Sequence, residues 1–253
     1  MKKPKMNISF VIPCYNCEGY IRNNIYKLYK KLKSLQINYE IILIDDYSTD
    51  KTFLNLNKLK NNIPKLKILK NTKNFGKSFS LIKGIRASKY KHVVYIDCDL
   101  PYFKSIYSII KYLKINDMVI VNRRKRGSKL KSYKLNFYQL MRALLGYSIN
   151  NFIRIWFNIN IRDTQAGLKG FVKPKNFSRI KFISKRFFFD LELILLFHFL
   201  KKKIFSLQTV HFVDEKSNIN FFNLKKNYET LIELIKICMN YKLLNEKTNN
   251  FLR

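Results

Sequence analysis

The stretch KHVVYIDCDL, residues 91–100, places a mostly apolar run, residues 92–96, directly before Asp97-Cys98-Asp99. An apolar run of this length, rich in β-branched and aromatic side chains, predicts a strand buried on both faces. The two carboxylates then stand at the carboxyl end of that strand. Because ligands of parallel sheets bind outside these strand ends, Asp97 and Asp99 are the first candidate site residues.

The same alternation extends outward in both directions from this stretch. Further apolar runs lie at 8–12, 39–44, 66–69 and 118–121, and amphipathic stretches lie between them at 18–34, 49–60, 76–87 and 102–113. A repeating strand–helix order predicts the α/β class, with a mostly parallel sheet and helices on both faces. After residue 121 the order breaks, and the pattern predicts a basic loop (122–133), a helix (135–157), a turn (163–170), helices at 175–182 and 188–200, a strand (204–212) and a last amphipathic helix (224–244).

Polar residues follow the other predicted strands as well, and all these ends should meet at one edge of the sheet. They are Pro13, Tyr15 and Glu18 after the first strand, Asp45 and Asp46 after the second, and Asn74, Gly76 and Lys77 after the third. A D-x-D pair suits Mg²⁺ or Mn²⁺ that shares its ligands with a diphosphate. A helix beginning at Gly76 beside Lys77 suits an anion. Each cluster also has a purely structural interpretation, as a solvated turn, a helix cap or a turn-to-helix junction.

Composition narrows the class of protein. Of 253 residues, 47% are hydrophobic and 15% aromatic, which excludes a disordered or collagen-like chain. Lys and Arg number 50 against 16 Asp and Glu, giving +34, which favours an anionic partner, although AT-rich coding also enriches lysine. The four cysteines make no disulfide framework in so long a chain, so we expect reduced, mostly buried thiols in a cytoplasmic protein without a transmembrane helix.

The motifs together carry a family resemblance. ISFVIPCYN, YEIILIDDYSTD, KNFGKS, VVYIDCDL and DTQAGLKGF, in this order, resemble the family 2 glycosyltransferases of GT-A fold. Within them the chain looks most like the polyprenyl-phosphate glycosyltransferases, such as the dolichyl-phosphate mannose and glucose synthases. The resemblance implies a Rossmann-like GT-A domain, expected over residues 1–215, and an inverting transfer of a sugar from a UDP- or GDP-linked donor to a lipid phosphate. Residues 216–253 are then a C-terminal amphipathic helical segment.

The resemblance also implies roles for individual residues. Those assigned to the donor nucleotide are Pro13, Tyr15, Glu18, Asp45, Asp46, Gly76, Lys77 and Asp97. Asp97 and Asp99 belong to the catalytic and metal site, with Mg²⁺ or Mn²⁺ as the cofactor. Phosphate and acceptor groups are assigned to Arg123, Arg142 and Lys169. A hydroxyl acceptor would need a general base, for which Asp163 and Glu192 are the candidates.

Two departures from the family pattern affect these expectations. Pro101 stands where the mannose synthases carry a glutamine, so the metal would be held by Asp99, the diphosphate and water. Many relatives also have transmembrane helices after the catalytic domain, and this sequence predicts none. We therefore expect the protein either to dock peripherally on the cytoplasmic face of an anionic membrane or to use a membrane-anchoring partner protein. Features that favour docking are the apolar and basic helix at 135–157 and a basic run comprising Arg123, Arg124, Lys125, Arg126, Lys129, Lys131 and Lys134. The same segments equally fit a helix packed on the domain and a solvated loop.

Other classes fit the sequence less well. A transferase of the same fold with a saccharide or other hydroxyl acceptor differs only in what it glycosylates. A basic nucleic-acid-binding protein is the more distant alternative, but carboxylates at the strand ends would repel phosphates, so we expect no nucleic acid partner. A sugar nucleotidyltransferase is expected to have a glycine-rich, basic loop after its first strand. Residues 13–19 have one glycine and no cation, which counts against this class.

Overall fold

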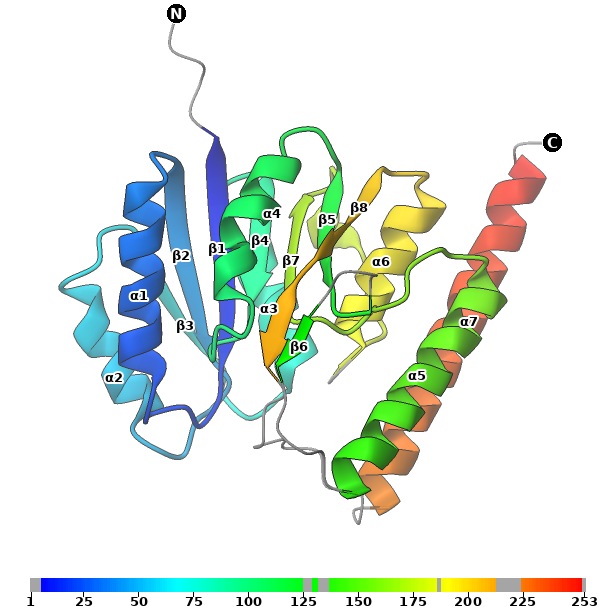
Figure 1. Ribbon diagram of the computed structural model, residues 1–253, viewed down its shortest axis with the longest axis horizontal. Coiled ribbons are helices and arrows are strands. Elements are labelled where there is room, and N and C mark those ends of the chain that lie inside the picture. The colour runs from blue at the N-terminus through cyan, green and yellow to red at the C-terminus, as the bar shows by residue number, and fades with distance from the viewer. Residues whose placement is uncertain (1–5, 125–128, 132–136, 186–187, 213–223, 252–253) are drawn as a thin grey trace, which may run out of the picture.

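The computed structural model describes residues 6–124, 129–131, 137–185, 188–212 and 224–251. Its centre is a seven-stranded sheet with the order β3-β2-β1-β4-β7-β5-β8 (Figure 1). Six of these strands run parallel, namely β1 (Asn7–Cys14), β2 (Asn38–Asp45), β3 (Leu66–Lys70), β4 (His92–Ile96), β5 (Met118–Asn122) and β8 (Ile204–Gln208). The mostly parallel α/β sheet expected from the sequence is therefore confirmed.

Helices cover both faces of the sheet because alternate strand residues point to opposite sides. On the first face, Phe10 and Ile12 pack with α1 (Ile21–Ser34), α2 (Thr52–Lys60) and α4 (Ile106–Tyr112). On the second, Val11 and Tyr95 pack with α3 (Lys77–Arg86) and α6 (Phe189–Phe199). Both clusters are fully buried, so the sheet is the middle layer of three.

Two long helices, α5 (Phe137–Phe157) and α7 (Leu224–Phe251), lie side by side beyond the β8 edge (Figure 1). Ile153 of α5 and Ile237 of α7 are wholly buried in the same core cluster as α6. The C-terminal helix thus packs on the core around the sheet, and the boundary expected at residue 215 falls outside the described residues. Within the described ranges, no helix combines the length and apolar character needed to cross a membrane.

Three local predictions after residue 121 were wrong. The expected turn over 163–170 ends in β7 (Leu168–Val172), which inserts antiparallel between β4 and β5. This strand was not expected because Lys169 lies in its middle. A charged residue in a central strand needs a buried partner, and the local sequence does not show one. The expected strand over 204–212 divides into β8 and β9 (Val210–Phe212), which pairs with β6 (Lys129–Lys131) inside the expected loop 122–133.

The expected helix over 175–182 is reduced to a single 3₁₀ turn, Phe177–Arg179. Pro174 precedes this segment and Asn176 takes a left-handed conformation with φ of 61°, so a regular helix cannot start there. Ile180 is already extended, which sends the chain toward the sheet edge where the candidate site lies.

Candidate functional site

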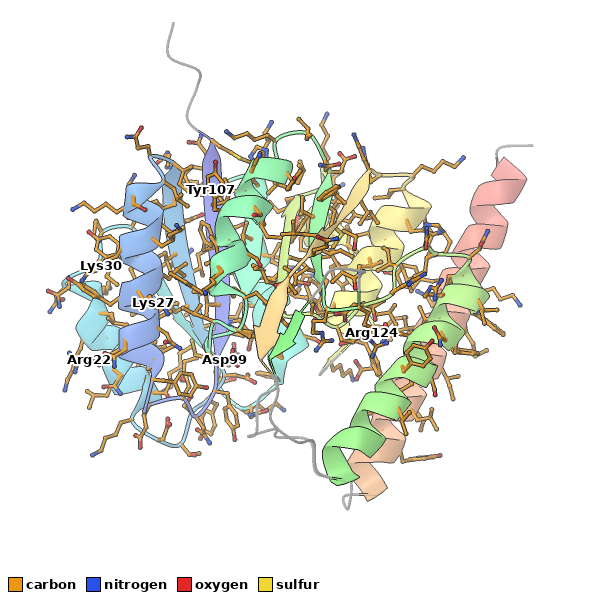
Figure 2. All side chains as sticks on the ribbon, viewed as in Figure 1. Arg22, Lys27, Lys30, Asp99, Tyr107 and Arg124 are labelled. Carbon is orange, nitrogen blue, oxygen red and sulfur yellow. The ribbon has the colours of Figure 1, made fainter. Side chains whose placement is uncertain are left out.

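The ends of β1, β2 and β4 meet at one edge of the sheet, and Figure 2 shows Asp99 at this edge. The ammonium of Lys77, the first residue of α3, lies 2.6 Å from Asp97 Oδ1, and both side chains are about one-third exposed. Although burial lowers the pKa of Lys77, Asp97 and Asp190 together raise it well above its usual range, so the ammonium stays charged. Asp99 is exposed. The site therefore combines a fixed cation with two carboxylates facing solvent.

Gly167 closes one side of Asp97. Its carbonyl accepts a hydrogen bond from the Asp97 amide at 3.1 Å, and a Cβ at this position would lie 1.8 Å from Asp97 Oδ2. No side chain fits in that space, so the backbone before β7 packs directly against the carboxylate. This contact holds Asp97 between the glycine and Lys77.

A buried ionic network lies beneath this edge. Asp190, in the first turn of α6, forms an ion pair with Lys169 of β7, accepts a hydrogen bond from the Tyr95 hydroxyl at 2.7 Å and lies 3.8 Å from Lys77 Nζ. Lys169 is fully buried and also donates to the Ala166 carbonyl. The phosphate-binding role expected for Lys169 is therefore corrected: its ammonium is enclosed by protein and positions Asp190.

The two adjacent carboxylates at the end of β2 have different environments. Asp46 accepts hydrogen bonds from the Asn71 amide group and from the backbone amides of Phe75 and Gly76, at 2.7–3.0 Å. It fixes the loop before α3, where Gly76 has φ of 94°. Asp45 is fully buried, and among the described residues its Oδ2 has no hydrogen-bond partner. Asp45 therefore keeps an unsatisfied acceptor, whereas both oxygens of Asp46 are used to fix the loop.

The turn after β1 is tied to the turn after β2. Asn16 exchanges hydrogen bonds with Ser48 and Thr49, and the Glu18 carboxylate accepts from the backbone amide of Lys51 at 2.6 Å. These contacts link the two turns just before α2 begins. Pro13 is half-buried and Tyr15 is 43% exposed, so the aromatic ring that follows β1 remains open to a ligand.

Arg123 enters the site from the end of β5. Its backbone amide and guanidinium donate three hydrogen bonds of 2.7–2.9 Å to Asp163, which is fully buried. Burial alone would raise the pKa of Asp163, but the hydrogen bonds and charge of Arg123 lower it to about 2. Such a carboxylate is a poor proton acceptor, so the expectation that Asp163 acts as a general base is corrected. Asp163 instead positions Arg123.

This pKa predicts how stability depends on pH. A carboxyl whose pKa is lower folded than unfolded stabilises the protein fully above its unfolded pKa, about 3.9, and the contribution disappears as pH falls toward 2. We expect Asp163→Asn to lower the free energy of unfolding by roughly 2–3 kcal/mol at pH 7. Urea unfolding between pH 7 and pH 3 should show this difference shrinking below pH 4; a difference independent of pH would contradict the assignment.

The remaining expected residues lie elsewhere or are not described. Glu192 is wholly buried in α6, where its two oxygens accept the backbone amides of Ile183 and Ser184 at 2.8 Å. Its proposed role as a base is corrected on the ground of access, because no substrate can reach a carboxylate that is buried and already accepts two backbone hydrogen bonds. The side chain of Arg142 lies outside the described residues.

The side chains at this edge can be compared with the ligands that a divalent cation requires. Among the described residues, no three His, Cys, Asp or Glu side chains converge to form a metal cage. Asp97 and Asp99 nevertheless provide the one or two carboxylates with which Mg²⁺ is typically held when phosphates complete its shell. Pro101 adds no ligand. The edge therefore fits a cation shared with a diphosphate ligand, and it does not fit one held by protein alone.

A basic groove on the outer surface of α1 and α2 begins beside Glu18 and Tyr20. Its cations are Arg22, Lys27, Lys30 and Lys58, of which Figure 2 labels three. Lys27 and Lys30 lie over the rings of Phe103 and Tyr26, at 4.6 and 4.8 Å. These four cations therefore add positive charge beside the turn that follows β1, where a basic surface raises the local concentration of anions.

Sequence reasoning missed the central acid of the network. Asp190 stands in the stretch FFFDLELILL, residues 187–196, and no role was assigned to it from the sequence. The available signal was an acidic residue in a helix that is apolar on every side, because such a residue must have a buried cation as its partner.

Known proteins resemble this chain in sequence and in fold. The family described as Glycosyl transferase family 2 matches residues 9–185. The putative glycosyltransferase CsbB of Bacillus subtilis is 30% identical over 62% of this chain and 45% of its own length. The dolichol-phosphate mannosyltransferase of Pyrococcus furiosus is 30% identical over 51% and 36%, and the dolichyl-phosphate β-glucosyltransferase of Dictyostelium discoideum is 29% identical over 68% and 56%. The chain thus spans about half the length of these curated relatives or less.

Among solved structures, glucosyl-3-phosphoglycerate synthase from Mycobacterium tuberculosis, in complex with Mn²⁺, uridine-diphosphate-glucose and phosphoglyceric acid, has a TM-score of 0.63. The two chains are 16% identical, and the match covers 92% of this chain and 80% of the other. A likeness at this identity concerns the fold alone, and it confirms the GT-A arrangement expected from the sequence.

Proposed function

The chain belongs to glycosyl transferase family 2, and from that membership we propose that it transfers a sugar from a nucleoside-diphosphate donor to a polyprenyl phosphate at a membrane surface. The observation that carries the proposal is the strand edge where the Lys77–Asp97 ion pair precedes the exposed residue Asp99, with Arg123 held by Asp163 at the end of β5. Two relatives named as dolichyl-phosphate transferases support a lipid phosphate as the acceptor.

The donor nucleotide binds over the ends of β1 and β2 in this proposal. Asp45 Oδ2, which is buried and without a partner among the described residues, accepts a hydrogen bond from the base or ribose, while Tyr15 packs against the nucleoside. The diphosphate then lies toward Lys77 and Arg123. Both side chains are about one-third exposed and each is already fixed by a carboxylate, so little reorganisation is needed when an anion arrives.

The chemistry follows from the charges. An oxygen of the acceptor phosphate attacks the anomeric carbon while the bond from that carbon to the diphosphate breaks, which inverts the configuration. Negative charge grows on the departing diphosphate, where the Lys77 ammonium and Arg123 guanidinium stabilise it. A phosphate acceptor is already anionic at neutral pH and needs no general base. This agrees with the positions of Asp163 and Glu192, both enclosed and fully hydrogen-bonded.

Asp97 and Asp99 would hold a divalent cation together with the diphosphate. Bound there, Mg²⁺ or Mn²⁺ supplies further neutralisation of the leaving group. The protein's part is to orient the two carboxylates, which Gly167 and Lys77 do for Asp97.

The acceptor would reach this edge from a membrane bound by α5 and α7. On α5, Leu144, Tyr147, Phe152, Ile155 and Trp156 are exposed, and on α7, Tyr228, Leu231, Ile235 and Met239. Cations lie among them: Arg124 is placed over Tyr147 and Lys242 over Trp156. Exposed apolar side chains among cations fit an anionic lipid surface, consistent with peripheral attachment on the cytoplasmic face. Lys125, Arg126 and Lys134 of the basic run lie outside the described residues.

Ile155 provides a direct test of this surface, because it is 84% exposed and its removal leaves no cavity. Burying an isoleucine side chain in lipid is worth about 1.5–3 kcal/mol, so Ile155→Ser should weaken binding to phosphatidylglycerol-rich vesicles by about tenfold or more. Co-sedimentation with such vesicles measures the change.

Ile115→Ser is the matched control, because Ile115 is 68% exposed but follows α4, away from α5 and α7. We expect this variant to bind vesicles as the unaltered protein does. Equal weakening by both substitutions, or by neither, would move the membrane contact to another surface.

The function itself is tested by label transfer. The protein is incubated with radiolabelled UDP- and GDP-sugars, Mn²⁺ or Mg²⁺, and undecaprenyl or dolichyl phosphate, and the label in the organic phase is counted. Label that requires the lipid phosphate supports the proposal and identifies the sugar. Donor turnover with label only in a saccharide would instead assign a hydroxyl acceptor, and absence of turnover with the whole panel would contradict the proposed activity.

A further inference from the structure

A chain of hydrogen bonds joins the C-terminal helix α7 to the first turn of α3. The Ser184 hydroxyl lies 2.7 Å from Glu233 Oε1 on α7 and 2.8 Å from the Ser78 hydroxyl on α3. Ser78 directly follows Lys77, the first residue of α3. Ser78 and Ser184 are 1% and 3% exposed, so water does not compete for the bond between them. Side chains of α3, α6 and α7 also belong to one core cluster, which places the three helices together.

The hydroxyl protons of this chain can run in one direction only. The Ser184 hydroxyl donates its single proton to the Glu233 carboxylate. Because a hydroxyl has only one proton, Ser184 must accept from the Ser78 hydroxyl. Ser78 in turn accepts from the backbone amide of Phe189, the first residue of α6, at 3.3 Å. The order of donors and acceptors is therefore fixed, and it ends at the carboxylate on α7.

The segment that carries Ser184 is held from two sides. Glu192 of α6 accepts two of its backbone amides at 2.8 Å, and Glu233 Oε1 of α7 accepts the Lys185 amide at 3.2 Å. The Lys185 carbonyl then accepts the backbone amide of Phe79 at 3.4 Å. Two carboxylates from different helices thus fix the short segment against which the first turn of α3 packs.

That turn carries the cation of the candidate site. Lys77 Nζ lies 2.6 Å from Asp97 and 3.8 Å from Asp190. The Ser78 hydroxyl links the residue after Lys77 to Phe189, the residue before Asp190. A displacement of Ser78 would therefore change where the ammonium lies relative to its carboxylate partners.

We propose that Glu233 is a positioning residue for Lys77, acting through Ser184 and Ser78. The place of the donor diphosphate beside Lys77 rests on the proposed function, whereas the coupling of α7 to α3 does not. Leu231 and Ile235, two residues to either side of Glu233, are exposed on the surface proposed to meet lipid. One stretch of α7 then carries both the lipid-facing side chains and the carboxylate that holds the first turn of α3.

Hydrogen exchange of the folded full-length protein, read by mass spectrometry of its peptides, tests the coupling without any ligand. Glu233→Ala removes the acceptor of two hydrogen bonds, so the first turn of α3 should exchange about tenfold faster or more. Peptides from α1 and α2, which pack on the other face of the sheet, should be unchanged. Ser184→Ala removes one hydroxyl from the middle of the chain, and we expect the same local effect without any change to α7.

Two further variants on α7 serve as matched controls. Glu233→Gln keeps an oxygen that can accept the same two hydrogen bonds, so α3 should retain its slow exchange. Glu229→Ala removes an exposed carboxylate one turn earlier on α7 and should leave α3 unaffected. The double variant Glu233→Ala with Ser184→Ala should exchange about as fast as Glu233→Ala alone, because both substitutions break the same chain.

Donor turnover gives the second measurement, and this part rests on the proposed function. Negative charge grows on the departing diphosphate, so a displaced Lys77 should lower the kcat of Glu233→Ala by about tenfold or more. The KM for the lipid phosphate should stay the same, and Glu233→Gln should restore kcat. Absence of turnover in the unaltered protein would contradict the proposed function, and the exchange measurement would still decide the coupling.

Unchanged exchange of α3 in both Glu233→Ala and Ser184→Ala would overturn the proposal. Faster exchange spread evenly over the whole chain would also overturn it, because it would show a general loss of stability. Equal effects of Glu233→Gln and Glu233→Ala would contradict the hydrogen-bonded chain. Local opening of α3 with kcat unchanged would remove Lys77 from its influence.

Discussion

Turnover of a nucleotide-sugar donor is expected to fall by about two to three orders of magnitude when Asp99 is replaced by asparagine. Asp99 is exposed at the strand edge, beside the fixed Asp97–Lys77 ion pair, where the diphosphate of the donor would lie. The substitution keeps the size of the side chain and removes its charge. Because little is buried, the melting temperature should change by no more than a few degrees.

Two measurements separate this effect from misfolding. Steady-state kinetics in the label-transfer assay give the loss of turnover, and calorimetry of UDP binding with and without Mn²⁺ shows whether the cation still strengthens nucleotide binding. Asp117→Asn is the matched control: the Asp117 carboxylate accepts the Lys203 backbone amide just before β5, at the opposite edge of the sheet. Turnover that is unchanged in Asp99→Asn would remove Asp99 from the site.

Replacing Asp190 with asparagine is expected to destabilise the folded protein by about 3–5 kcal/mol. Asp190 is 1% exposed and is the carboxylate that neutralises the fully buried Lys169. Asparagine can still accept a hydrogen bond from Tyr95, but the buried ammonium is then left without its counter-charge. Breaking one side of a buried ion pair costs far more than removing the whole pair, because one charge stays enclosed.

A double-mutant cycle tests this explanation by urea unfolding at pH 7. Asp190→Asn and Lys169→Met should each be strongly destabilising, and the double variant should recover part of the loss because no lone charge remains buried. Asp117→Asn, whose carboxylate has no ion-pair partner among the described residues, should stay within about 1 kcal/mol. Strictly additive effects would show that Asp190 and Lys169 are not coupled.

Periodicity made much of the fold predictable. Strand runs such as His92–Ile96 are mostly apolar and lie between amphipathic helices, so the parallel sheet and the acidic edge at Asp97 follow from local pattern alone. The same reasoning failed at β7, where Lys169 and Gly170 interrupt the apolar run. That strand becomes acceptable only because Asp190, 21 residues later, neutralises the lysine.

The sequence by itself determined the α/β architecture, the family and the set of polar residues that gather at one edge, because hydrophobic period and strand-end position are local properties. Only the tertiary structure decided which of them face a ligand. It separated Asp45 from Asp46, and enclosed Asp163, Lys169 and Glu192 among their partners. Burial and pairing depend on contacts between residues far apart in the chain, and no local pattern specifies those contacts.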